Sequence, residues 1–253
     1  MTSGFTPDRG VRFEISGQFA HFRNIFTQAF FETLLGPPRP TILGMIGGAL
    51  GMGEADTIEL GKKVQVGLKI IEIKGFANEV TTALNLKLPY VRPGDSEAME
   101  TEWPIRTPVL RSILIEPKYE ICVVSNDTSL LLRIANSVCA PAYPAYLGIS
   151  DFLGYVTRVD ENISGLTRGS SKAIECVAPV TDRDKYVVRL HNPISGFYMP
   201  PRRYHTIHSF NLTPEGRRHD RYIDLLMFFG YCVEFAQEKE IYEFEDGAHF
   251  CVF

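Results

Sequence analysis

Apolar and polar residues alternate in several short segments, which is the pattern of half-buried β-strands. In the first, Val11, Phe13 and Ile15 are separated by polar side chains. Similar runs predict strands at 111–115, 118–124 and 153–159, and in the last third of the chain at 174–180, 186–190 and 225–235.

The alternation in residues 64–74 changes phase once. Val64, Val66, Leu68 and Ile70 are apolar at even positions, and apolar residues then continue at Ile71 and Ile73. A shift of one residue within a strand is what a β-bulge produces. We therefore predict a strand with a bulge near residue 70.

Two segments have helical periodicity. In residues 41–50 the side chains of Ile42, Met45, Ile46 and Ala49 share one helix face, and Pro40 favours a helix start there. Residues 129–138 predict a second helix, capped by Asp127 or Thr128 and ending before Pro141.

The first helix also carries a stripe of glycines. Each interior glycine costs about 1 kcal/mol relative to alanine, so the stripe predicts close approach of another backbone or of a ligand. The spacing matches neither a GxGxxG turn after a strand nor a P-loop, so it does not favour a dinucleotide site. The stripe comprises Gly44, Gly47, Gly48 and Gly51.

Residues 77–108 lack sustained periodicity and contain Pro89, Pro93 and Pro104. Long excursions of this kind are often functional, and we predict a projecting hairpin. The order strand, helix, strand, excursion, strand, helix, strand is that of an α+β, ferredoxin-like or RNA-recognition-type core. We expect residues 1–160 to form this domain, with the excursion inserted, and residues 161–253 to form a β-rich C-terminal lobe.

Composition narrows the class of protein. The 253 residues include 45% hydrophobic residues, enough for a sizeable core, and carry a formal net charge of −4. An acidic balance does not favour a general nucleic-acid coat protein, although residues 201–222 gather five arginines. The polar first ten residues do not resemble a signal peptide, and the apolar run at 41–53 is shorter than a membrane helix. We therefore expect a cytoplasmic protein without membrane contact.

Candidate chemistry is sparse. The five cysteines form no CxxC pair and predict reduced, mostly buried thiols. The pair His205 and His208, with His219 nearby, lacks a carboxylate or thiol that would complete a zinc pattern, so no metal or other cofactor is predicted. A GxSxG nucleophile motif is absent from the sequence.

Two blocks carry a resemblance to a known family. The first is Phe13-x-x-x-Gly17-x-Phe19-Ala20-x-Phe22-Arg23, and the second is Pro37-Pro38-Arg39-Pro40-Thr41-Ile42-Leu43-Gly44-x-x-Gly47-x-x-Leu50-Gly51. Shorter stretches at 144–148 and 199–204 agree with them. Together these residues resemble the Cas-five family, the RAMP-type subunits of type I CRISPR Cascade complexes. The firm resemblance covers residues 11–151 and leaves the subtype open, with an I-B-like system as a candidate.

The resemblance implies a ferredoxin-like core with an inserted β-hairpin thumb at 77–108. It also implies a non-catalytic subunit that caps the 5′ handle of the CRISPR RNA. The expected partners are CRISPR RNA, the Cascade backbone subunit and the Cascade large subunit, with target DNA reached indirectly. In one subtype the family member itself cuts the precursor RNA. A metal-independent endoribonuclease is therefore the alternative, with His21 as the candidate base.

The residues expected at the RNA come from four parts of the chain. Arg23, Arg39 and Thr41 surround the predicted helix start, and arginine suits phosphate through its forked donors. The acidic residues Asp95, Glu97, Glu100 and Glu102 would repel phosphate, so we assign the thumb tip to protein contact or solvent. The remaining candidates are Gly44, Gly47 and Gly48 in the helix, Tyr90, Arg92, Trp103 and Arg106 in the excursion, and Arg202 and Arg203.

Overall fold

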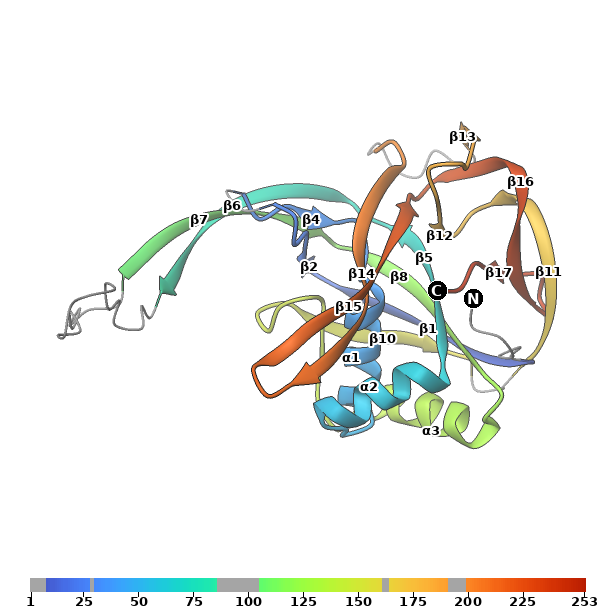
Figure 1. The fold of residues 1–253 in the computed structure, drawn as a ribbon, viewed down its shortest axis with the longest axis horizontal. Helices are drawn as coiled ribbons and strands as arrows, with labels where there is room; N and C mark the ends of the chain where they lie inside the picture. The colour runs from blue at the N-terminus through green and yellow to red at the C-terminus, as the bar shows by residue number, and fades with distance from the viewer. Residues whose placement is uncertain (1–7, 28–29, 86–104, 161–163, 191–198) are drawn as a thin grey trace.

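The computed structural model describes residues 8–27, 30–85, 105–160, 164–190 and 199–253. In these residues a large antiparallel sheet forms the centre of the molecule, three helices lie together on one side, and a long hairpin projects from the body (Figure 1). The fold is a mixed α and β structure in which strands predominate, in agreement with the predicted class.

Four strands form the middle of the sheet in the order β10–β1–β8–β5, and each neighbouring pair is antiparallel. Val11, Phe13 and Ile15 of β1 are buried in the main core, as their alternation predicts. The four strands are β1 (Arg9–Gly17), β5 (Gln65–Glu72), β8 (Lys118–Ser125) and β10 (Leu153–Val159).

Strand β5 contains the predicted bulge. Its pairing with β8 shifts register between Ile70 and Glu72, where the sequence changes phase. Leu68 and Ile70 are buried before the shift and Ile73 is buried after it. The extra residue lets both apolar sets reach the core.

The helices are α1 (Arg39–Ala49), α2 (Glu54–Lys63) and α3 (Thr128–Cys139). Helices α1 and α3 confirm the predictions at 41–50 and 129–138. The Asp127 carboxylate caps α3 by accepting from the Leu130 amide at 3.0 Å. Helix α2 was not predicted, because Leu60 is its one fully buried side chain and no apolar stripe marks it.

The sheet continues beyond its central strands. Arg9 and Gly10 of β1 pair with β11 (Ser164–Ile174), so the sheet runs across the predicted division at residue 160. A second core lies here and contains three buried free thiols, Cys122, Cys176 and Cys251. The outer strands are β16 (Tyr231–Phe244), β13 (Tyr186–Leu190), β17 (His249–Phe250) and, beyond β10, β9 (Ala145–Tyr146).

Two hairpins shape the surface. Strand β6 (Gly75–Asn85) pairs with β7 (Ile105–Ile115) in the hairpin that projects from the body (Figure 1). Strand β14 (Arg202–Thr213) pairs with β15 (Gly216–Met227), and β14 packs against α1. The remaining short strands are β2 (Phe19–Ala20), β3 (Phe22–Arg23), β4 (Thr33–Leu34) and β12 (Ala178–Pro179).

Several predictions need correction. Residues 225–235 are not one strand, because β15 ends at Met227 and the chain turns at Gly230, whose φ is +72°, before β16. Residues 174–180 likewise divide between the end of β11 and β12. The projecting hairpin is longer than the predicted excursion, because regular strands extend it back to Gly75 and on to Ile115.

Candidate nucleic-acid interface

The predicted interface begins at the N-terminus of α1. Pro38 caps the helix with an extended backbone (φ −68°, ψ 162°), and Pro40 lies in the first turn. The amides of Thr41 and Ile42 both donate to the Pro38 carbonyl. The prolines therefore fix the direction of the helix, and they leave neither of these two amides free for a phosphate.

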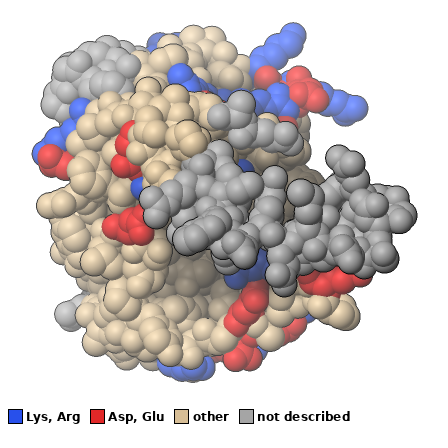
Figure 2. Space-filling view, turned by 90° about the vertical axis from the view of Figure 1, so that its left-hand side faces the viewer, with Lys and Arg blue, Asp and Glu red and all other residues tan. Residues whose placement is uncertain are grey.

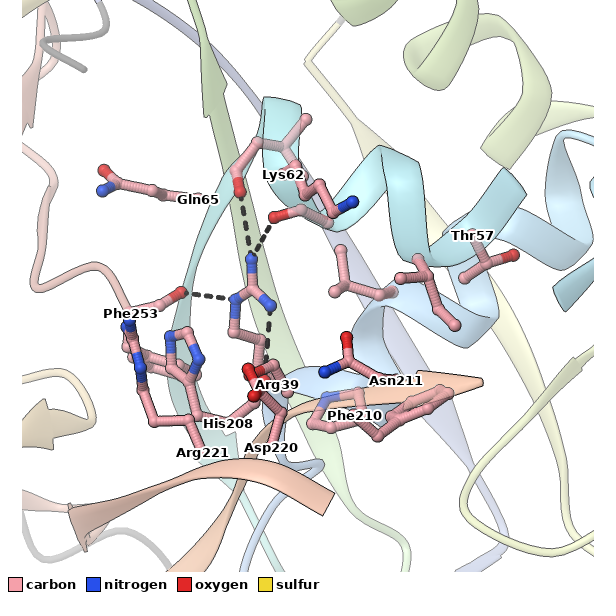
Figure 3. Close-up of a pocket in the computed structure, with 16 residues that line it drawn as sticks. Arg39, Thr57, Lys62, Gln65, His208, Phe210, Asn211, Asp220, Arg221 and Phe253 are labelled. Atoms are coloured by element: carbon pink, nitrogen blue, oxygen red, sulfur yellow. Dashed lines mark hydrogen bonds between the residues drawn. The ribbon is translucent and has the colours of Figure 1, made fainter. Parts of the chain in front are cut away.

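Arg39 lies in this turn, and hydrogen bonds tie its guanidinium to neighbouring segments (Figure 3). Only 6% of the residue is exposed, and burial together with Arg221 lowers its pKa to about 10, so it stays charged at neutral pH. Arg39 thus has a structural role that the sequence did not predict, and its burial does not favour the predicted RNA contact. Its guanidinium donates to the backbone carbonyls of Gly61, Val64, His208 and Phe253.

The glycines of α1 have two different roles. A Cβ on Gly47 would lie 2.4 Å from Oγ1 of Thr57 in α2, so glycine allows the two helices to approach. A Cβ on Gly44 or Gly48 would meet nothing within 4 Å. With Thr41, these two glycines follow helical spacing on one face. Gly47 therefore serves packing, in place of the predicted ligand contact, while Gly44 and Gly48 leave a surface open.

That surface belongs to a groove of about 580 Å³. Tyr143 and Tyr146 line it from the segment around β9, and they are 62% and 40% exposed. Phe210 and Arg217 line it from the β14–β15 hairpin, with the guanidinium 5.1 Å from the centre of the phenyl ring and ion-paired with Glu54, which also lines the groove. Exposed aromatic rings beside a cation are the usual means of stacking single-stranded nucleic acid.

Arg23 lines a smaller neighbouring pocket of about 210 Å³. Thr41 and Pro40 line both this pocket and the groove. The exposed Arg23 guanidinium stacks on the Phe31 ring at 3.9 Å, which holds it in place by a cation–π contact. The structure thus brings Arg23 and Thr41 to one continuous surface.

An exposed cluster of rings at this pocket was missed in the sequence. His205 stacks on Tyr222 with centroids 5.1 Å apart and an interplanar angle of 17°, and Phe26 packs against both. The Nδ1 atom of His205 lies 2.6 Å from Oδ1 of Asp224. These residues come together through the register of the β14–β15 hairpin and the position of a loop distant in sequence. No local sequence pattern therefore predicts the cluster.

Arg202 and Arg203 lie at the start of β14 and are exposed. Arg202 pairs with Glu32 at 3.4 Å, whereas Arg203 pairs with Asp182 at 2.7 Å and with Asp224. Exposed ion pairs are weak, so a phosphate can compete for these guanidinium groups. Their acidic neighbours nevertheless reduce the local positive charge.

His21, the candidate base, is only 3% exposed. Its Nδ1 atom lies 2.8 Å from the Ser112 carbonyl oxygen. Because a carbonyl only accepts, Nδ1 carries the proton and Nε2 is the basic atom. Burial lowers the pKa of the imidazole. This placement does not favour a general base, which must come within about 3 Å of the substrate hydroxyl.

Of the four candidate residues in the predicted excursion, the structure describes Arg106. Tyr90, Arg92 and Trp103 lie outside the described residues, as do the acidic residues between 95 and 102. Arg106 lies in β7, opposite Leu84 of β6. The groove and the Arg23 pocket are therefore the described parts of the candidate interface.

Figure 2 shows the face toward which the β6–β7 hairpin projects, where positive and negative side chains are interspersed.

Within the described ranges, no group of three or more His, Cys, Asp or Glu residues could hold a metal ion. No helix in the same ranges is long and apolar enough to cross a membrane.

Comparison with known proteins decides the family. A family model described as CRISPR-associated protein (Cas_Cas5) matches residues 10–222. The chain belongs to this family. Membership confirms the resemblance carried by the two motif blocks. A comparison with curated proteins found no match.

Two solved structures are similar in fold. One is titled "Crystal structure of a CRISPR protein from Archaeoglobus fulgidus", with a TM-score of 0.54 and 15% identity, covering 96% of this chain and 98% of that chain. The other is titled "CRISPR RNA-guided surveillance complex", with a TM-score of 0.52 and 14% identity, covering 90% and 91%. At this identity the likeness shows a shared fold.

Proposed function

We propose that the chain is the RNA-binding subunit that caps the 5′ handle of the CRISPR RNA in a type I Cascade complex. The observation that carries this proposal is the groove over Gly44 and Gly48, lined by exposed tyrosines and by Phe210 with Arg217. Family membership supplies the CRISPR setting. The groove supplies a surface of the right chemistry for single-stranded RNA.

The topology supports the finer assignment of the fold. Strand order β10–β1–β8–β5, with α1 after β1 and α3 after β8, is the arrangement of a ferredoxin-like core. We assign the β6–β7 hairpin as the inserted thumb of this family, because it leaves the core between β5 and β8. The C-terminal strands extend the same sheet as a β-rich elaboration.

The groove predicts how RNA is held. Without a Cβ at Gly44 and Gly48, the sugar–phosphate backbone can approach the helix closely. Bases then stack on Tyr143 or Tyr146. Phosphates pair with Arg23 and compete with Glu54 for the exposed Arg217. Because the Thr41 and Ile42 amides are already bonded to Pro38, we assign phosphate binding to these arginines and not to the helix terminus.

The proposal includes the partners that such a subunit needs. They are CRISPR RNA, the Cascade backbone subunit and the Cascade large subunit, through which target DNA is reached, all in the cytoplasm. Purification of the tagged chain from its native host tests this directly. We expect co-purifying subunits and an RNA of uniform 5′ end, and less RNA when Tyr143 and Arg217 are both replaced by alanine. Recovery of the chain alone, without RNA, would contradict the proposal.

We further propose that the protein does not cleave RNA. The test is incubation of the purified chain with the host repeat RNA in the absence of metal, followed by mapping of the ends. We expect intact RNA. A single cut at a fixed position, lost in His21→Ala, would establish the ribonuclease alternative. Loss of that cut in His205→Ala would instead assign it to the exposed histidine, which Asp224 orients.

A further inference from the structure

A third cavity, of about 340 Å³, lies between α2 and the β14–β15 hairpin (Figure 3). It shares three lining residues, Pro40, Thr57 and Phe210, with the groove. The two spaces therefore adjoin each other. Its volume is within the range of pockets that bind small organic molecules.

The lining of this cavity combines apolar walls with positive charge. Leu43, Ile58 and Phe210 contribute apolar surface. Arg39, Lys62 and Arg221 belong to the lining with one carboxylate, Asp220. The Arg39 donors are bonded to backbone carbonyls and the exposed Lys62 pairs with Glu59, so Arg221 is the main candidate for an anion. Asp220 accepts a hydrogen bond from the Ser209 hydroxyl, which offsets part of the negative charge of its carboxylate. The cavity therefore fits a flat apolar body that carries an anionic group.

Two polar atoms of the lining are buried without a hydrogen-bond partner, Oε1 of Gln65 and Nδ1 of His208. Buried polar groups are ordinarily paired, but these two atoms are closed off from the cavity and do not contact a molecule bound in it. Burial, Arg39 and Arg221 lower the pKa of His208 to about 4, so its ring is neutral at pH 7. The charge of the cavity wall at pH 7 therefore comes from its arginines, its lysine and Asp220.

We infer that this cavity binds one nucleotide, with its base against Phe210 and Leu43 and its phosphate toward Arg221 and Lys62. The inference rests on the proposed function for the source of the nucleotide. An RNA strand in the groove would turn one base past Phe210 into the cavity, as proteins commonly do with single-stranded RNA. A simple anion would use the arginines but leave the apolar walls without a role.

The first experiment uses free mononucleotides, because they test the cavity independently of the groove. AMP, GMP, CMP and UMP are titrated separately into the purified full chain by calorimetry. We expect at least one to bind, and Arg221→Glu to weaken it by about tenfold or more. Arg218→Glu is the matched control, because Arg218 is an exposed arginine of the same strand that lines none of the three pockets. Absence of binding by all four, or equal loss in both variants, would overturn the inference.

The second experiment asks whether the nucleotide comes from RNA. Host repeat RNA is prepared with 2-aminopurine at successive positions, and its fluorescence is measured on binding. We expect one position to respond, and Asn211→Trp to abolish that response by filling the cavity. Leu212→Trp, on the neighbouring position outside the cavity, should leave it unchanged.

The two experiments distinguish failure of the cavity inference from failure of the proposed function. Mononucleotide binding without a responding RNA position would overturn the RNA source and assign the cavity to a free nucleotide. Failure of RNA binding in the unmodified chain would count against the proposed function. The mononucleotide titration would still test whether the cavity binds a nucleotide.

Discussion

The Nε atom of Arg39 lies 3.1 Å from the backbone carbonyl oxygen of Phe253, although 214 positions separate the two residues. The same guanidinium also reaches carbonyls of α2, of β14 and of the turn into β5. One side chain in the first turn of α1 therefore ties together segments that are distant in sequence.

Replacing Arg39 should destabilise the protein strongly. Arg39→Ala would leave buried carbonyl oxygens without donors, and we expect the free energy of unfolding to fall by about 3 kcal/mol or more. Urea denaturation measures this change, with Arg218→Ala as an exposed control expected to stay within about 0.5 kcal/mol. A loss below about 1 kcal/mol for Arg39→Ala would show that the hydrogen bonds of Arg39 contribute little to stability.

Substitutions of the α1 glycines should affect either the stability of the fold or RNA binding, depending on the position. Gly47→Ala would place a methyl group against Thr57, and we expect a loss of about 1–3 kcal/mol in unfolding free energy. Gly48→Ala should instead stabilise by about 1 kcal/mol, because nothing opposes the new methyl group. Gly44→Leu should keep the fold but weaken RNA binding by obstructing the groove. Unchanged RNA affinity in Gly44→Leu would remove the groove from the interface.

The arginines of the interface should show their role in the salt dependence of binding. Arg23→Ala and Arg217→Ala should each lower RNA affinity and reduce the slope of log K against log salt by about 1. Fluorescence anisotropy at several salt concentrations measures both quantities. Arg218→Ala provides the comparison, and a slope that does not differ between Arg217→Ala and Arg218→Ala would contradict the assignment.

His208 should make stability depend on pH. Its pKa is lowered to about 4 by burial and by Arg39 and Arg221, whereas an unfolded histidine titrates near 6.5. The unfolded chain therefore takes up this proton first, and the contribution of the neutral ring is lost as pH falls from about 6.5 toward 4.

We expect His208→Asn to reduce the loss of stability over this range by on the order of 1–3 kcal/mol. Urea denaturation at pH 7 and pH 4.5 measures the effect, and His219→Asn serves as the exposed control. If both variants keep the pH dependence of the unmodified chain, another group is responsible.

Periodicity predicted the parts of the fold in which one face is buried. Strand β1, the bulge of β5 and the cap of α3 were all visible, because each has a local signal in side-chain pattern or turn chemistry. Helix α2 was not predicted, since it buries mainly Leu60 and packs against α1. The boundary between β15 and β16 was hidden because apolar residues continue through the turn at Gly230.

The candidate site was predicted only in part, for a different reason. The motif around α1 identified the correct region, but it did not distinguish Gly47, which meets Thr57, from Gly44 and Gly48, which face open space. An arginine before a helix looks like a phosphate ligand in a sequence, and only the tertiary structure shows Arg39 pointing inward. The stack of His205 on Tyr222 depends on strand register, which composition does not specify.

The central position of β1 has a consequence for how the chain folds. Its partners in the sheet begin at residues 118, 153 and 164, so β1 stays unpaired until more than a hundred further residues have been synthesised. At about 5–20 residues per second, the nascent chain displays an apolar strand for roughly 5–20 seconds. Such long-range pairing also slows folding. Production of this protein should therefore benefit from a low level of expression, which keeps the concentration of unpaired chains low, and from chaperones that shield Val11, Phe13 and Ile15 during that interval.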